Sequence, residues 1–208
     1  MDGFVMVHGG LGVIALGAGL VAAVAPKRRG LHVWAGRVFA SILLGSLLVV
    51  AVPIVLRGNV FMLGLGTVAW FAVVEGWRAL LRVRGTIAPG PGWVDYLAVA
   101  LTTACATGLG VFGAVGVLTS GNPLYAVCIA FTALGWTLGW QAWRRWSMDL
   151  TAKQWLDVHI GHMSGALGAA VTAAAVVNLE GLVGGFEWVL WIAPTVVSTG
   201  WAQRVMRA

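Results

Sequence analysis

The sequence predicts an all-α fold, a polytopic transmembrane helical bundle of about seven spans that forms a single domain over residues 1–208. Hydrophobic residues make up 60% of the chain and charged residues only 10%, and the mean hydropathy is +0.91. A soluble domain cannot bury that much apolar surface in its core. The apolar runs are continuous and about 20 residues long, the length of a membrane-spanning helix. A transmembrane β-barrel is not expected, because its strands are short and alternate between apolar and polar residues.

Charges, prolines and glycines divide the chain into predicted spans with approximate bounds of 4–25, 33–56, 59–79, 93–118, 123–143, 154–178 and 186–203. The first run is followed rather than preceded by basic residues, the reverse of a cleavable signal, so we expect a retained helix. Gly85–Gly92 is expected to form a flexible turn, and Asn122 and Pro123 are expected to open the fifth helix. Thr151 and Gln154 have the spacing of a capping box, which predicts the start of the sixth helix.

The lysines and arginines indicate how the spans are oriented. If the spans alternate in direction, Arg57 alone falls on one side of the membrane, and the other side receives Lys27, Arg28, Arg29, Arg37, Arg78, Arg82, Arg84, Arg144, Arg145, Lys153, Arg204 and Arg207. By the positive-inside rule the basic side is cytoplasmic, so the amino terminus is expected outside and the carboxyl terminus inside. We therefore expect a multi-pass protein of the cell (inner) membrane, with the lipid bilayer as its surroundings. No nucleic-acid partner is expected, because the basic residues form short clusters between apolar runs.

Tryptophans near both ends of the spans are expected to form the aromatic belts of a membrane protein, with Trp155 on the inner side. Trp136, Trp140 and Trp143 share one face of the fifth predicted helix, because they are four and three residues apart. Such a stripe can stack against a planar ligand. Ordinary packing within a helix bundle is the favoured interpretation.

Four histidines are the main candidates for chemistry, because an ionisable side chain within a membrane span is costly and usually functional. His32 begins the second predicted span, and His159 and His162 lie in the inner half of the sixth, so these three are expected at one depth. His8 lies near the outer face. Residues three apart on a helix share roughly one face. The inner imidazoles are therefore predicted to bind haem b or a divalent metal ion such as zinc, with Asp157 or a backbone carbonyl orienting a ring.

The acidic residues have simpler expected roles. Asp157 lies in the first turns of the sixth predicted helix, where the helix dipole favours an anion. Glu75 and Arg78 are three residues apart and are expected to pair with each other at the surface. Asp95 is expected at the membrane interface.

Small and polar residues accompany the histidines. Asn178 is expected at the depth of His8, so these two side chains could hydrogen-bond across helices as part of an outer site. Small neighbours let another helix or a flat macrocycle approach the backbone closely, and helix packing is the favoured explanation. These neighbours are Gly161, Ser164, Gly165 and Gly168 around the inner histidines and Gly9, Gly10 and Gly12 beside His8.

Two stretches of the chain resemble a family of bacterial multi-pass membrane proteins. Arg29–Phe39 has an HxxxGR pattern, and Trp155–Asn178 has the expected order of His159, Ile160, Met163, Gly165, Thr172 and Asn178. The resemblance covers the first two helices and the sixth, and it implies an architecture but no activity, because the family has no established one. Position 162 is histidine where the family commonly has arginine. The resemblance therefore implies that a haem would depend mainly on His32 and His159.

Four functions remain open from the sequence. The first is a redox protein with one or two b-type haems between helices one, two and six, which exchanges electrons with a quinone or a partner membrane subunit. The second is a carrier or channel for protons, metal ions or a small molecule, with the histidines and Asp157 as a relay. The third is a zinc-dependent intramembrane hydrolase that uses His32, His159 and His162. The fourth is a subunit of a larger membrane complex without chemistry of its own. An ATPase or an ordinary hydrolase is not expected, because the sequence has no nucleotide-binding loop and no catalytic triad.

Overall fold

The computed structural model describes residues 2–27, 30–56, 58–121, 125–179, 182, 184 and 187–207. These residues contain seven α-helices and no β-strand, which confirms the predicted all-α class. The helices are α1 (Asp2–Val24), α2 (Leu31–Leu56), α3 (Val60–Val83), α4 (Trp93–Ser120), α5 (Ala126–Trp146), α6 (Ala152–Leu179) and α7 (Glu187–Arg207). Each helix coincides with one of the predicted apolar runs.

Five of the described helices are long and apolar enough to cross a membrane, over Gly3–Val24, Leu31–Ile54, Val60–Val83, Trp93–Ser120 and Ala152–Leu179. The chain therefore has the helices of a multi-pass integral membrane protein. α5 and α7 do not reach that hydropathy, because both are rich in tryptophan and both have two arginines in the last turn.

The helix ends differ from the predicted bounds in ways that matter for the charged residues. α3 continues to Val83, so Arg82 belongs to the helix rather than to the following turn. Arg144 and Arg145 likewise lie in the last turn of α5. Because helical residues face fixed neighbours, these arginines can bind across helices. Asn122 and Pro123, expected to open the fifth helix, lie outside the described residues.

The capping box at the start of α6 is confirmed. The backbone N–H of Thr151 donates to Oε1 of Gln154 over 2.8 Å, and the backbone N–H of Gln154 donates to Oγ1 of Thr151 over 3.3 Å. These bonds satisfy amide groups that the first turn of a helix leaves without a partner. They fix where α6 begins, and so the depth of His159.

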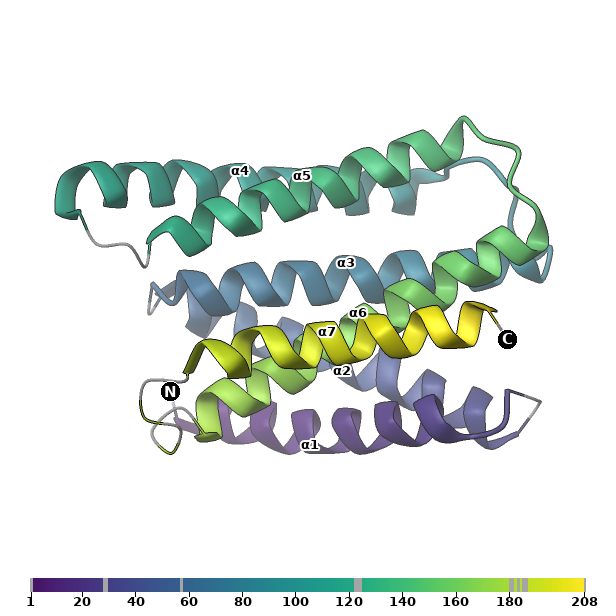
Figure 1. Cartoon of the computed structure of the whole chain (residues 1–208), viewed down its shortest axis with the longest axis horizontal. Helices are drawn as coiled ribbons and strands as arrows, with labels where there is room; N and C mark the ends of the chain where they lie inside the picture. Colours follow the sequence, from purple (N-terminus) through teal and green to yellow (C-terminus); the bar gives the residue numbers. More distant parts are fainter. Residues whose placement is uncertain are drawn as a thin grey trace.

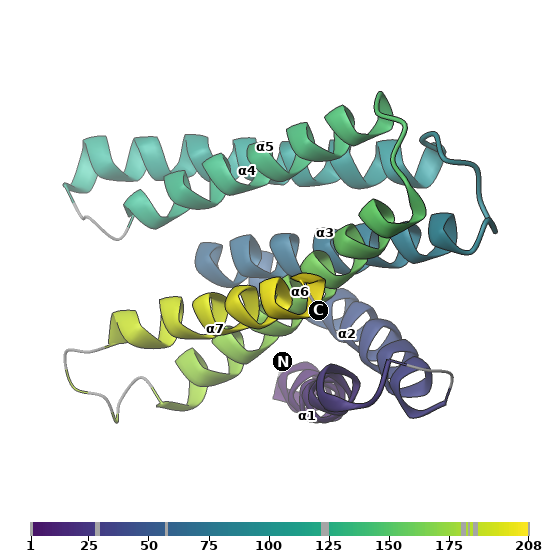
Figure 2. The ribbon, with the colours of Figure 1, turned by 45° about the vertical axis from the view of Figure 1, so that its right-hand side comes forward.

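The helices pack in a simple order around α3. α4 and α5 form a hairpin along one side of α3, and α6, α7, α1 and α2 lie on the other side (Figure 1). In Figure 2 α1 is viewed nearly along its axis, whereas α4 and α5 are seen lengthwise. Helix α1 therefore crosses the α4–α5 hairpin at a steep angle. The main cluster of buried side chains joins α1, α2, α3 and α6 and consists of Ala15, Phe39, Ala40, Leu43, Ala72, Val73 and Ala166. Its small members let the helices approach closely.

Gly76 shows how close α3 and α6 are. A Cβ atom at this position would lie 3.0 Å from Sδ of Met163 and 3.3 Å from Cβ of His162. Successive helices run in opposite directions, so the α1–α2, α3–α4 and α5–α6 connections and the carboxyl end of α7 lie together (Figure 1). We call this the basic end, because it contains every described lysine and arginine: Lys27, Arg37, Arg78, Arg82, Arg84, Arg144, Arg145, Lys153, Arg204 and Arg207.

Candidate functional site

Two histidines at the basic end are oriented in the same way. Nδ1 of His32, in the first turn of α2, lies 2.8 Å from the carbonyl oxygen of Ala22 in α1. Nδ1 of His159, near the start of α6, lies 2.8 Å from the carbonyl oxygen of Gly76 in α3. A carbonyl oxygen can only accept, so Nδ1 donates in both rings. In the neutral ring Nε2 is then unprotonated, which is the form that binds a metal.

These contacts use backbone carbonyls, one of the two ways in which the rings were expected to be oriented. Asp157, the other candidate, makes no hydrogen bond or ion pair with any residue that the structure describes. The carbonyl of Ala22 also accepts from Nζ of Lys27, over 2.9 Å. Partial burial lowers the pKa of Lys27 from the usual value for lysine. The carbonyl oxygen of Ala22, near the carboxyl end of α1, thus accepts hydrogen bonds from both Lys27 and His32.

His32 in α2 and His159 in α6 both lie toward the basic end of the bundle. Gly36 lies one turn along α2 from His32 and on the same face. A Cβ atom at Gly36 would have no other group within 4 Å. No neighbouring group therefore packs on α2 at this position.

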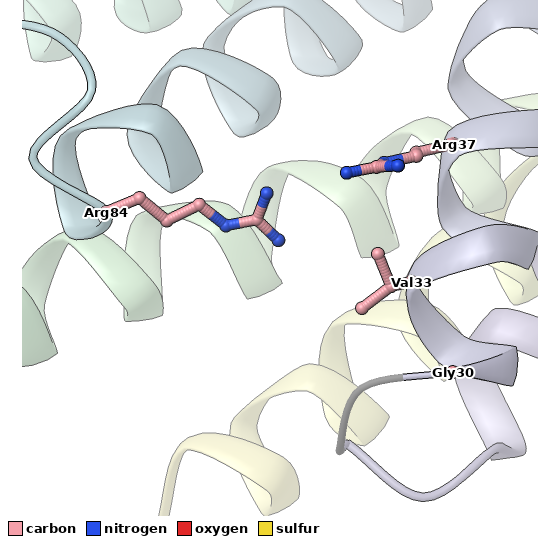
Figure 3. Close-up of a pocket in the computed structure, with 4 residues that line it drawn as sticks. All are labelled: Gly30, Val33, Arg37 and Arg84. Carbon is pink, nitrogen blue, oxygen red and sulfur yellow. The ribbon is translucent and has the colours of Figure 1, made fainter.

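A cavity of about 400 Å³ opens at the same end, between the start of α2 and the end of α3. It is lined by Gly30, Val33, Arg37 and Arg84. Figure 3 shows the guanidinium groups of Arg37 and Arg84 pointing toward each other across this cavity. Neither side chain forms a hydrogen bond or an ion pair with another described residue.

His162 does not join the other two inner histidines. Its Nε2 lies 3.3 Å from Nη2 of Arg145 in α5, and its ring meets the ring of Phe71 edge-on, 5.9 Å between centroids. The guanidinium can only donate, so Nε2 of His162 is used as an acceptor. In the described part of the chain, no group of three or more His, Cys, Asp or Glu residues is placed to hold a metal ion. The hydrogen-bonding partner of His162 is therefore Arg145, whereas the partners of His32 and His159 are backbone carbonyls.

Arg145 belongs to a network of buried ion pairs that join α3 to both helices of the hairpin. Glu75 is only 1% exposed, and its Oε2 lies 3.3 Å from Nη2 of Arg145. Asp95, in the first turn of α4, is fully buried and accepts from Arg78, from Nη2 of Arg82 at 2.9 Å and from the backbone N–H that precedes α4. The expectation of a surface pair between Glu75 and Arg78 is wrong. Helices α4 and α5 supply the partners instead, because both pack on α3 at this depth.

Arg82 extends the network toward α6 and the α3–α4 connection. Its guanidinium lies 4.7 Å from the centre of the Trp155 ring, and it donates to the carbonyl oxygens of Pro89 and Gly90 over 3.1 and 3.3 Å. Trp155 is only 4% exposed, so the expectation that it belongs to an interfacial belt is wrong. The stacked cation explains why an aromatic ring is buried here.

The opposite end has a smaller polar contact. Nδ1 of His8 lies 2.7 Å from Oγ and 3.2 Å from the carbonyl oxygen of Ser46 in α2. Asn178 donates instead to the carbonyl of Ala174 in its own helix, over 2.7 Å, so the predicted bond between His8 and Asn178 is wrong. The predicted outer site therefore lacks one of its members.

The other predicted features are the tryptophan stripe on α5 and the small residues near the histidines. Trp136, Trp140 and Trp143 are all exposed, so the stripe on α5 is not part of the bundle core. Ser164 is buried. Among the glycines near the histidines, a Cβ atom at Gly168 would collide with α7, and one at Gly161, Gly165, Gly9, Gly10 or Gly12 would have no contact within 4 Å. Helix packing thus accounts for Gly168 alone.

The chain matches no protein-family model, and no curated protein and no solved structure is significantly similar to it.

Proposed function

We propose that this chain is a membrane electron-transfer protein that binds one haem b through His32 and His159. We also propose that all seven helices cross the bacterial inner membrane, with the amino terminus outside and the basic end in the cytoplasm. The observation that supports the haem is the common orientation of the two rings, each of which donates from Nδ1 to a backbone carbonyl. Axial histidines of metal sites are commonly oriented in this way.

Other observations agree with two imidazole ligands and one haem. The open face at Gly36 leaves space for a flat group beside His32. Of the four histidines in the sequence, only His8 lies at the opposite end, and its Nδ1 contacts Ser46. A second haem with two histidine ligands would therefore lack a ligand.

The chain's own residues would position the haem and shield it. Bound haem supplies one-electron transfer, and a quinone or a partner membrane subunit would exchange the electron. The carbonyl of Gly76 belongs to the tight contact between α3 and α6, so His159 is held by two packed helices rather than by a loop. Ala22 holds His32 from the last turns of α1. We propose that His32 and His159 correspond to the two histidines in the pattern of the bacterial family that the chain resembles.

Visible absorption of the protein purified in mild detergent tests this proposal, together with iron and zinc analysis of the same sample. We expect a Soret band and, after reduction, the sharp bands of a b-type cytochrome. His32→Ala and His159→Ala should each lose haem, because each removes one ligand. His8→Ala is the matched control and should keep the full spectrum.

A colourless, iron-free protein from haem-replete cells would refute the haem proposal. Equal spectra from the wild-type protein and the two inner variants would refute the ligand assignment. Zinc in place of iron would instead favour the intramembrane hydrolase.

A carrier of protons is the second candidate, and Glu75 favours it. Its Oε1 is buried and has no partner among the described residues, although its Oε2 faces Arg145. Buried carboxyl groups in membrane spans often transfer protons. Vesicles with the purified protein and an internal pH indicator test this function. A proton flux that is lost in Glu75→Gln and kept in His8→Ala would establish it, and no flux above that of empty vesicles would rule it out.

A further inference from the structure

We propose that the cavity between α2 and α3 is a binding site for a phosphate group, held by Arg37 and Arg84. This site is separate from the proposed haem ligands, because its lining contains neither His32 nor His159. Its argument and its test therefore stand without a haem.

The first argument is the arrangement of charge. The two guanidinium groups point toward each other across the cavity (Figure 3), and none of its described lining residues is acidic. Three of the other arginines at the basic end have a carboxylate partner: Asp95 for Arg78 and Arg82, and Glu75 for Arg145. Arg37 and Arg84 have no described partner. Two facing cations without an acid form a site for an anion.

The second argument is the chemistry of the donors. A guanidinium presents several N–H groups in a planar fork, which matches the oxygens of a phosphate group. Two such forks on opposite walls can bind different oxygens of the same group. A phosphate has enough acceptor oxygens for both, and its negative charge offsets the repulsion between the arginines.

The third argument is the backbone beside the arginines. Gly30 has a φ of 115°, a conformation that glycine adopts readily, and it turns the chain into α2. The cavity therefore opens beside the first turn of a long helix, where the helix dipole is positive. This contribution adds to that of the arginines and does not replace it.

The position of the cavity favours a phospholipid headgroup over a free phosphate ion. Arg37 lies six residues beyond the start of α2, or about 9 Å along the helix, which is the depth of a headgroup layer at the end of a span. Leu31 and Trp34, in the first turn of α2, are exposed apolar side chains. They offer a surface for the upper part of an acyl chain next to the phosphate.

Binding measurements on the delipidated protein in detergent test the proposal with two probes. Native mass spectrometry measures binding of dioleoylphosphatidylglycerol, and the shift in Tm measures binding of inorganic phosphate against sodium chloride of equal ionic strength. We expect each of Arg37→Gln and Arg84→Gln to weaken binding about tenfold and the double variant about a hundredfold, as the loss of charged hydrogen bonds predicts. Arg204→Gln is the control, because Arg204 is an exposed arginine at the same end that does not line the cavity.

Each outcome decides the question. Lipid binding that is lost in the double variant and not displaced by inorganic phosphate supports a headgroup site. A Tm shift by inorganic phosphate that is lost in the double variant supports a site for the free ion. Equal binding of both probes to wild type and double variant would overturn the proposal, and so would an equal loss in Arg204→Gln. The Tm of the variants without a probe should equal that of the wild type, since the side chains of Arg37 and Arg84 are exposed. If the double variant does not fold, binding to the two single variants decides the question.

Discussion

Two cavities of nearly equal size lie at opposite ends of the α1–α2 pair, and their linings have different chemistry. The cavity at the basic end has a volume of about 400 Å³ and two arginines in its wall. The cavity at the opposite end has a volume of about 420 Å³ and is lined by Gly3, Phe4, Val7 and Val49. Since the two cavities have nearly the same volume, their lining side chains decide what each cavity could bind. The described lining of the first cavity offers cationic groups, and that of the second is apolar.

The same contrast extends to the buried polar residues. At the basic end, Glu75, Asp95 and three arginines connect α3 to α4 and α5. At the opposite end, a hydrogen bond between His8 and Ser46 connects α1 to α2. The two ends should therefore differ strongly in how much a single polar side chain contributes to stability.

Asp95→Ala is expected to have the largest effect. It leaves Arg78 and Arg82 without their carboxylate, and breaking a buried ion pair costs about 3 to 5 kcal/mol. Unfolding in mixed micelles of increasing SDS fraction, followed by circular dichroism, measures the loss. Asp149→Ala is the control, because Asp149 is exposed at the same end and has no described partner. A loss no greater than in this control would contradict the assignment of the ion pair.

A double-mutant cycle on Glu75 and Arg145 should give an intermediate effect. Each single change to leucine leaves one buried charge without its partner, whereas the double change removes both charges. We expect the double variant to be more stable than the sum of the single losses predicts, by about 1 to 3 kcal/mol. The same SDS titration measures the coupling. Additive losses would mean that the two side chains do not interact.

Ser46→Ala at the opposite end should have the smallest effect. It removes a hydrogen bond to His8, and interhelical hydrogen bonds within membranes contribute about 0.6 kcal/mol on average. Ser41→Ala in the same helix is the control, because Ser41 is exposed and has no described partner. If Ser46→Ala destabilises the protein as much as Asp95→Ala, the contrast between the two ends is wrong.

The sequence predicts the helices well, because hydropathy and helix length act locally. The capping box at Thr151 and Gln154 is confirmed for the same reason: all its bonds lie within four residues. The connections between successive helices are short, so neighbouring helices in the sequence are antiparallel. This order brings the basic clusters to one end. Whether all seven helices span the membrane stays a prediction.

The partners of the charged residues could not be predicted so easily. Glu75 and Arg78 are spaced for an intrahelical pair, but the rotation of α3 directs them to different neighbouring helices. Only the positions of α4 and α5 decide between these possibilities. One signal was present in the sequence: Asp95 and Arg145 lie at the depth of Glu75 and Arg78, and a buried charge at that depth needs a partner.

The contact between Glu75 and Arg145 also has a consequence for how the protein is made. The two residues are 70 positions apart, so Glu75 leaves the ribosome before Arg145 does. Until then its carboxyl group must stay protonated, remain near water or associate with another protein. The hairpin of α4 and α5 is therefore the segment whose arrival completes the charge balance of α3. A nascent chain halted before Arg145 should be the form that membrane quality control recognises most readily.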